Sequence, residues 1–360
     1  MSLPATAGAP TRPVYIAGIG HCSARGLDAE SAATAILAGD HACTRRELLG
    51  ARHPWFALPL AEADWTARAR AAVQAVGSQL TAGLAPERVA RLPLFIGSSS
   101  LQAGAIETAA RQRGRVDMPP DAAAFAADIA AWLGVAGTPW TFSTSCTSGV
   151  AALDAARTLI AAGLLDEALV LGFEFANDTT LAGFAGLGIL AETPEADGLV
   201  LGEAIAGVLL SAAPQAGWRI AACRLGVDGH AATAPAPDGK VIEAIIAAAL
   251  ADAGLAPQDI DLIKPHRGRL ASTDEAEAAA LARLFGTRHL PEIALKRQLG
   301  HTLGASGPAE LTALLAMLDH PAGRARHGTP QRLLLDLIGF GGSIAALVVT
   351  RSSEPAQAVA

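Results

Sequence analysis

The sequence predicts an α/β protein in which helices pack on a sheet, built from two halves of similar rhythm. Short apolar runs alternate along the chain with longer Ala/Leu-rich segments of helical spacing. Such alternation is typical of a mainly parallel sheet covered by helices. The composition agrees, because 51% of the 360 residues are apolar and 17% are charged, which is enough apolar surface for a large buried core.

The first half, residues 1–217, is expected to hold most of the strands. Strands are expected at 14–20, 92–97, 140–143, 167–172 and 204–211, and helices at 27–37, 65–82, 121–133 and 150–163. The segments 45–64 and 173–198 show no clear period and are expected to be irregular.

The second half, residues 218–360, repeats the rhythm after a boundary at Pro214-Gln-Ala-Gly217. Strands are expected at 218–225, 260–265 and 344–350, and helices at 240–253, 274–285 and 308–318. No low-complexity linker separates the halves, so we expect an internally duplicated fold that packs as one unit.

Composition also excludes several classes of protein. Four widely spaced cysteines without a CxxC pair favour reduced thiols in a cytoplasmic setting over disulfides or a zinc site. The net charge of −7 argues against general nucleic-acid binding. The first ten residues lack the basic and apolar regions of a signal peptide, and no apolar run is long enough to predict a membrane span.

Cys146 lies in the stretch Thr141-Phe-Ser-Thr-Ser-Cys146-Thr-Ser-Gly149, at a predicted corner between a strand and a helix. Small residues on both sides would let a substrate approach the backbone. The positive end of a helix lowers a thiol pKa, so this position predicts a reactive nucleophile. A buried core cysteine is the alternative interpretation.

Two histidines are candidates to work with Cys146. His266 follows a predicted buried strand and precedes a helix that Ser272, Thr273 or Asp274 would cap. His301 lies in Gly300-His-Thr-Leu-Gly304, where glycines leave the backbone open to close approach. Taken singly, each is also compatible with an ordinary loop histidine.

Three further residues and one turn complete the set. Lys296 and Glu310 are spaced to orient His301 from either side, and Gly339-Phe-Gly-Gly342 can aim a backbone N–H at a developing oxyanion. The Phe340 ring would guard the cavity, and Phe184 is a second candidate for its wall.

Together these motifs resemble the β-ketoacyl-acyl-carrier-protein synthases of the thiolase superfamily, of the Cys-His-His type. The resemblance spans residues 13–350 and rests on four ordered landmarks, at Cys146, at His266, at the His301 box and at Gly339–Gly342. It implies a thiolase-like duplicated αβαβα layered fold.

The resemblance also implies an activity, a decarboxylative condensation that needs no metal or organic cofactor. Cys146 would carry the acyl group, and the backbone N–H groups of Cys146 and Phe340 would form the oxyanion hole. His266 and His301 would donate hydrogen bonds to the enolate from malonyl-carrier protein, with Lys296 beside them. Supporting roles fall to Glu310, Asp274 and Glu277.

The family further implies an acyl carrier protein as partner and a dimer, formed through the strand before the nucleophile. Arg68 and Arg70 lie where docking cations are often found, although a solvated helix face is equally compatible. A heterodimer with a related subunit is the other arrangement we consider.

One loop departs from the family pattern. The family has His-Gly-Thr-x-Thr, whose threonines bind the pantetheine arm, whereas this chain reads His266-Arg-Gly-Arg-Leu270. Arg267 and Arg269 are candidates for replacement contacts. The departure favours a specialised polyene or polyketide pathway. The alternatives are a non-catalytic chain-length partner, which Cys146 argues against, and a coenzyme A-dependent thiolase-like acyltransferase, which lacks support from a second cysteine motif.

Overall fold

The computed structural model describes residues 12–61, 64–116 and 121–353, so the first ten residues, on which the signal-peptide prediction rests, lie outside it. Its strands are β1 Tyr15–Ser23, β2 Thr44–Leu48, β3 Ala51–Phe56, β4 Leu94–Gly97, β5 Trp140–Phe142, β6 Glu167–Glu174, β7 Leu201–Gly202, β8 Ala204–Ser211, β9 Gly217–Val227, β10 Leu262–Lys264, β11 Arg332–Ile338 and β12 Ser343–Ser352.

The helices are α1 Ala29–Leu37, α2 Trp65–Leu80, α3 Pro86–Arg91, α4 Ala103–Arg113, α5 Ala122–Leu133, α6 Ser148–Ala161, α7 Asp178–Gly186, α8 Lys240–Asp252, α9 Ala271–Phe285, α10 Lys296–Leu299, α11 Ser306–Asp319 and α12 Pro321–His327. All predicted strands and helices are present, β8 with the predicted bounds and the others with shifted ends. The segments expected to be irregular instead contain the hairpin β2–β3 and the helix α7.

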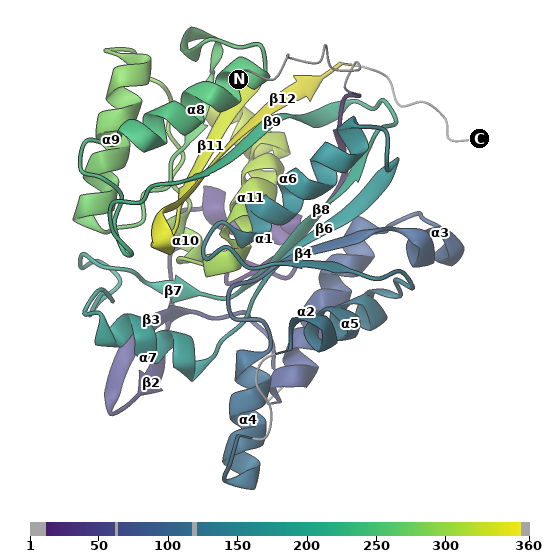
Figure 1. Ribbon diagram of the computed structural model, residues 1–360, viewed down its shortest axis with the longest axis vertical. Coiled ribbons are helices and arrows are strands. Elements are labelled where there is room, and N and C mark those ends of the chain that lie inside the picture. Colours follow the sequence, from purple (N-terminus) through teal and green to yellow (C-terminus); the bar gives the residue numbers. More distant parts are fainter. Residues whose placement is uncertain (1–11, 62–63, 117–120, 354–360) are drawn as a thin grey trace, which may run out of the picture.

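The main sheet has nine strands in the order β10-β11-β12-β9-β1-β8-β6-β4-β5 (Figure 1). The expectation of a mainly parallel sheet is wrong, because only β10–β11, β4–β5 and β4–β6 pair in parallel. The turn at 339–342 makes β11 and β12 an antiparallel hairpin, and β8 is inserted antiparallel between β1 and β6. An alternating pattern along the sequence does not reveal such insertions.

Helices form three layers with the two parts of the sheet between them, which confirms the predicted layering. The central layer contains α6 and α11, whose apolar residues pack between the β1-containing and β9-containing parts of the sheet (Figure 1). Helices α2 and α5 cover the outer face of one part, and α8 and α9 cover the outer face of the other. Burying both faces of a sheet explains the long apolar runs in its strands.

The central layer is closely packed where α6 begins, directly after Cys146. A Cβ atom at Gly149 would lie 2.3 Å from Cδ of Pro308 and 2.8 Å from the carbonyl oxygen of Gly304. Glycine therefore lets α6 approach α11 and the loop before it, and this approach places the cysteine motif against the His301 motif.

We expect Gly149→Ala to destabilise the protein by about 2 kcal/mol, because its methyl group would overlap backbone and a proline ring. In an uncrowded helix the same change usually stabilises. Thermal unfolding measures the effect, with Gly137→Ala as the matched control because a Cβ there meets no atom within 4 Å. An unchanged or higher melting temperature for Gly149→Ala would contradict the packing described.

Candidate active site

Cys146 lies on a tight turn between β5 and α6. Ser145, the residue before it, has φ +58°, a left-handed conformation that serine adopts only when the surroundings hold it there. The Ser148 hydroxyl holds this turn, since it accepts from Thr144 N at 2.9 Å and donates to Ser145 O at 2.5 Å. The turn leaves the Cys146 side chain 96% buried, facing the ends of β10 and β11.

The predicted low pKa of Cys146 is wrong. Burial raises the pKa of the thiol, and this effect outweighs the Ser145 hydroxyl 3.8 Å from Sγ, the backbone N–H of Phe340 and the charge of Lys296, which all lower it. The helix start alone does not offset the removal of a thiolate from water.

His266 and His301 meet Cys146 in one enclosed cavity. The two imidazole rings lie with centroids 5.7 Å apart at 77° to each other. The cavity is also lined by Phe184, Phe340 and the residues around them, and its volume is about 10 Å³, close to that of one water molecule.

Hydrogen bonds fix the proton on each ring. Nδ1 of His266 accepts from the backbone N–H of Ile338 at 3.2 Å, and Nδ1 of His301 accepts from that of Leu303 at 3.0 Å. A backbone N–H can only donate, so the proton of each neutral ring is on Nε2. Both rings therefore offer an Nε2–H donor.

Both histidines are neutral over the physiological pH range. Burial is the main cause, and the nearby charge of Lys296 adds to it, so that the pKa of His301 falls to about 3 and the pKa of His266 lies well below its usual value. The backbone of His301 is fixed as well, by its N–H to Val200 O at 2.7 Å and by Gly202 N–H to its carbonyl at 3.1 Å.

The acidic residues predicted to support the histidines are close to them. Glu310 pairs with Lys296 at 2.5 Å, and both side chains are buried. Glu277 accepts from the backbone N–H of His266 and, at 3.1 Å, from that of Arg267. Asp274 accepts from Arg269 N at 3.1 Å. The predicted cap is wrong, because α9 begins after Leu270 without a side-chain cap.

Phe184 and Phe340 form one wall of the cavity. Their rings are stacked at 5.4 Å with an angle of 16° between their planes, and both pack in the apolar cluster that contains Cys146. The backbone at Gly339 lies directly against Cys146, because a Cβ there would be 3.1 Å from the Cβ of the cysteine. The turn therefore places the Phe340 N–H beside the sulfur.

Arg68 is not where a docking cation should be. Its guanidinium points inward, 3.1 Å from the buried carboxylate of Glu203 and 4.9 Å from the ring centre of Phe175. Only Arg70 of the predicted pair is exposed. Arg267 is also engaged, in an ion pair with Glu292 at 2.9 Å.

Two buried ionisable residues escaped the sequence prediction. Lys264 donates to Glu310, and Asp336 is buried behind Glu277. Lys264 ends the apolar strand Leu262-Ile-Lys264, and Asp336 interrupts the apolar run Leu333-Leu-Leu-Asp-Leu-Ile338. An ionisable residue in such an apolar run is the signal that could have identified them.

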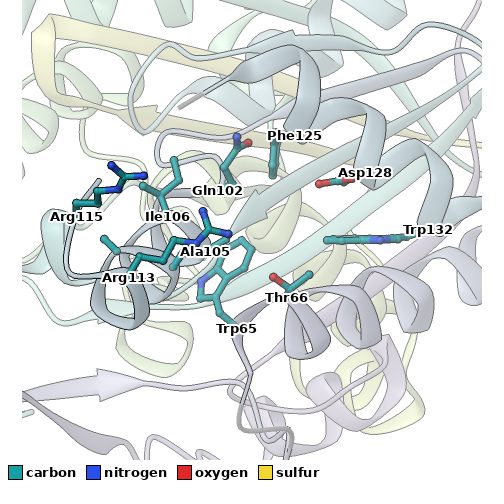
Figure 2. Close-up of a pocket in the computed structure, with 12 residues that line it drawn as sticks. Trp65, Thr66, Gln102, Ala105, Ile106, Arg113, Arg115, Phe125, Asp128 and Trp132 are labelled. Atoms are coloured by element: carbon teal, nitrogen blue, oxygen red, sulfur yellow. The ribbon is translucent and has the colours of Figure 1, made fainter. Parts of the chain in front are cut away.

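A larger cavity of about 240 Å³ lies between α2, α4 and α5, away from these residues. Figure 2 shows Trp65, Phe125, Trp132 and Arg113 among the residues that line it. It contains none of the predicted catalytic groups, so its size does not make it the catalytic centre. Among the described residues, no cluster of three or more His, Cys, Asp or Glu could hold a metal ion, and no helix could cross a membrane.

The raised pKa of Cys146 has a direct consequence for its chemistry. Alkylation of Cys146 by iodoacetamide is expected to have its midpoint above pH 8.5, the usual thiol value, since only the thiolate reacts. Peptide mass mapping between pH 6 and 10 measures it, with half-buried Cys43 as an internal reference. A midpoint below that of free cysteine would show that the helix start outweighs burial.

Comparison with known proteins agrees with this geometry. A family model described as "Beta-ketoacyl synthase, N-terminal domain" matches residues 66–216, and one described as "Beta-ketoacyl synthase, C-terminal domain" matches residues 219–323.

Curated relatives are similar over part of their length. The 3-oxoacyl-[acyl-carrier-protein] synthase 2 of Coxiella burnetii is 28% identical over 251 residues, which is 58% of this chain and 60% of the relative. The enzyme of the same name from Mycobacterium tuberculosis is 30% identical over 249 residues, which is 58% of this chain and 60% of the relative. The chain thus aligns with about 60% of the length of these relatives.

Solved structures share the fold along nearly the whole chain. One chain of the complex of the ketosynthase ApeO with its chain length factor ApeC, from Xenorhabdus doucetiae, gives a TM-score of 0.81 at 22% identity, and the match covers 95% of this chain and 98% of that one. A β-ketoacyl synthase of Burkholderia phymatum gives a TM-score of 0.77 at 24% identity, and the match covers 95% of this chain and 100% of that one. The two family models together span most of the chain, which therefore belongs to the β-ketoacyl synthase family.

Proposed function

We propose that the protein is a β-ketoacyl-acyl-carrier-protein synthase that joins an acyl group to malonyl-carrier protein with loss of carbon dioxide. The observation that carries this proposal is the pair of neutral imidazoles whose Nδ1 atoms are occupied by backbone N–H groups. Each ring then keeps one donor, Nε2–H, and both histidines line the cavity shared with Cys146.

The first half-reaction uses Cys146. Its thiolate attacks the carbonyl carbon of an acyl thioester, the carrier thiol leaves, and the acyl group stays on sulfur. The oxyanion formed on the way would be stabilised by the N–H groups of Cys146 and Phe340. The N–H of Phe340 already reaches the sulfur, so it needs little movement to serve this role.

The second half-reaction uses the histidines. A malonyl thioester bound by the two Nε2–H donors loses carbon dioxide, and the electron pair of the broken bond becomes an enolate held by those donors. Its carbon attacks the acyl-cysteine, the Cys146 thiolate leaves, and the product is longer by two carbons. Uncharged donors suit this step, because a charged imidazolium would hold the substrate carboxylate in an ion pair, whereas a neutral ring does not.

We propose a division of labour between the halves. The half at residues 1–217 supplies the nucleophile, and the half at 218–360 supplies both histidines. The assembly would be a dimer formed through the edge strand β5, either with itself or with a related subunit. The similarity to one chain of the complex of ApeO with its chain length factor supports the second arrangement. The exposed Arg70 remains a docking prediction for the acidic carrier.

Acyl transfer to Cys146 is the first test. Incubation with acyl-carrier proteins should add one acyl group to the intact mass, and Cys146→Ala should abolish it while Cys43→Ala does not. No adduct from any acyl donor would favour a non-catalytic chain-length partner. Equal transfer from coenzyme A esters would favour the thiolase-like alternative.

Gly268→Ala tests the role of His266 without replacing the histidine itself. A Cβ at Gly268 would lie 2.6 Å from Nε2 of His266, so its methyl group would obstruct the Nε2–H donor. We expect condensation to fall about 100-fold, the usual effect of losing one donor of this kind, while acyl transfer to Cys146 persists. Unchanged condensation relative to Gly137→Ala would exclude His266 as the donor.

A further inference from the structure

Two buried lysines share one carboxylate behind the histidines. Lys264 ends β10, two residues before His266, and its ammonium donates to Glu310 and, at 2.8 Å, to the carbonyl of Asp336 on β11. The other oxygen of Glu310 pairs with Lys296 at 2.5 Å. The exposed fraction of these three ionised side chains is at most 2%.

This use of lysine is unusual within the chain. It has three lysines in all, and Lys240 is exposed at the surface, with 77% of its side chain accessible. Every other cation of the chain is an arginine. Both remaining lysines are therefore placed on a single buried carboxylate, although burial of an ammonium is costly unless its charge is balanced.

The charges of the cluster balance only if Asp336 is neutral. Lys264 and Lys296 contribute two positive charges, and Glu310 and Glu277 contribute two negative charges; Arg267 beside Glu277 has its own partner in Glu292. Burial and the proximity of Glu277 raise the pKa of Asp336 well above its usual value, and no donor among the described residues reaches either of its oxygens. A protonated Asp336 that donates to Glu277 accounts for both observations.

We propose that Lys264 is a positioning residue that keeps His266 and His301 neutral and correctly placed for the decarboxylation step. This inference rests on the proposed function. Lys264 connects β10, α11 and β11 through its two hydrogen bonds, and β11 also supplies the Ile338 N–H that holds the His266 ring.

The charge of Lys264 acts on both rings in the same direction. After burial and Lys296, it lowers the pKa of His266 and of His301, because a nearby positive charge disfavours imidazolium. The largest effects on the thiol pKa of Cys146 come instead from burial, Ser145, Phe340, Lys296 and Glu174. Besides facing each other, the two rings face ionisable groups from four surrounding elements. These groups are Lys296 of α10, Lys264 of β10, Glu310 of α11 and Cys146 before α6. Glu277 of α9 and Asp336 of β11 lie behind them.

The test separates the two half-reactions in the full-length protein. Lys264→Gln keeps a donor but removes the charge, and Lys264→Met removes both. For each variant, acyl transfer to Cys146 is measured by intact mass, and carbon dioxide release from a small malonyl thioester is measured between pH 4.5 and 7.5. Lys240→Met is the control, and thermal unfolding confirms that each variant is folded.

We expect acyl transfer within twofold of wild type, and carbon dioxide release reduced about 10-fold at pH 7.5. At pH 4.5 the ratio of wild-type to variant carbon dioxide release should be about threefold larger than at pH 7.5, because loss of the charge raises the pKa of both rings toward pH 4.5. Lys264 is not a positioning residue if Lys264→Gln and Lys264→Met release carbon dioxide as fast as wild type. The same conclusion follows if both variants lose acyl transfer and carbon dioxide release equally at every pH. A wild-type protein that neither accepts an acyl group nor releases carbon dioxide would instead overturn the proposed function.

Discussion

Two backbone N–H groups determine what the catalytic centre can do. Those of Ile338 and Leu303 donate to the Nδ1 atoms of His266 and His301, and this leaves the only ring proton of each histidine on Nε2. The first donor stands at the end of β11 and the second in the turn before α11. The sheet and the central helix layer thus set the tautomers directly, and neither ring can act as a hydrogen-bond acceptor toward the cavity without losing a bond to the backbone.

Burial acts in opposite directions on the groups of this site. It favours the neutral form of each group, which suits two histidines that donate hydrogen bonds and disfavours a cysteine that must ionise. Each unit of pKa corresponds to about 1.4 kcal/mol, so even a partial offset matters. The Ser145 hydroxyl, the Phe340 N–H and the charge of Lys296 provide that offset for Cys146. In the proposed mechanism Lys296 would therefore assist both steps, since the same charge stabilises a thiolate and destabilises an imidazolium.

The sequence was most informative where chemistry is local. The nucleophile turn, the His301 box and the Gly339–Gly342 turn each bring their own glycines and small residues, so their positions were readable without a structure. The β2–β3 hairpin was missed because Arg45, Arg46 and Arg52 obscure any apolar period. The inward turn of Arg68 depends on Glu203, which is 135 residues away along the chain, and no local pattern encodes that contact.

The loop after His266 departs from the family pattern in a way that involves its backbone conformation as well as its side chains. The loss of two threonines suggests a change of side chains only. In this structure, however, Arg267 and Arg269 both have left-handed backbones, with φ of 41° and 68°. Gly268 between them leaves no room for a Cβ, which would lie 2.6 Å from Nε2 of His266. Glu277 and Asp274 hold this path through the backbone N–H groups of Arg267 and Arg269. A threonine at position 268 therefore does not fit this loop, whose path is held by the carboxylates of α9.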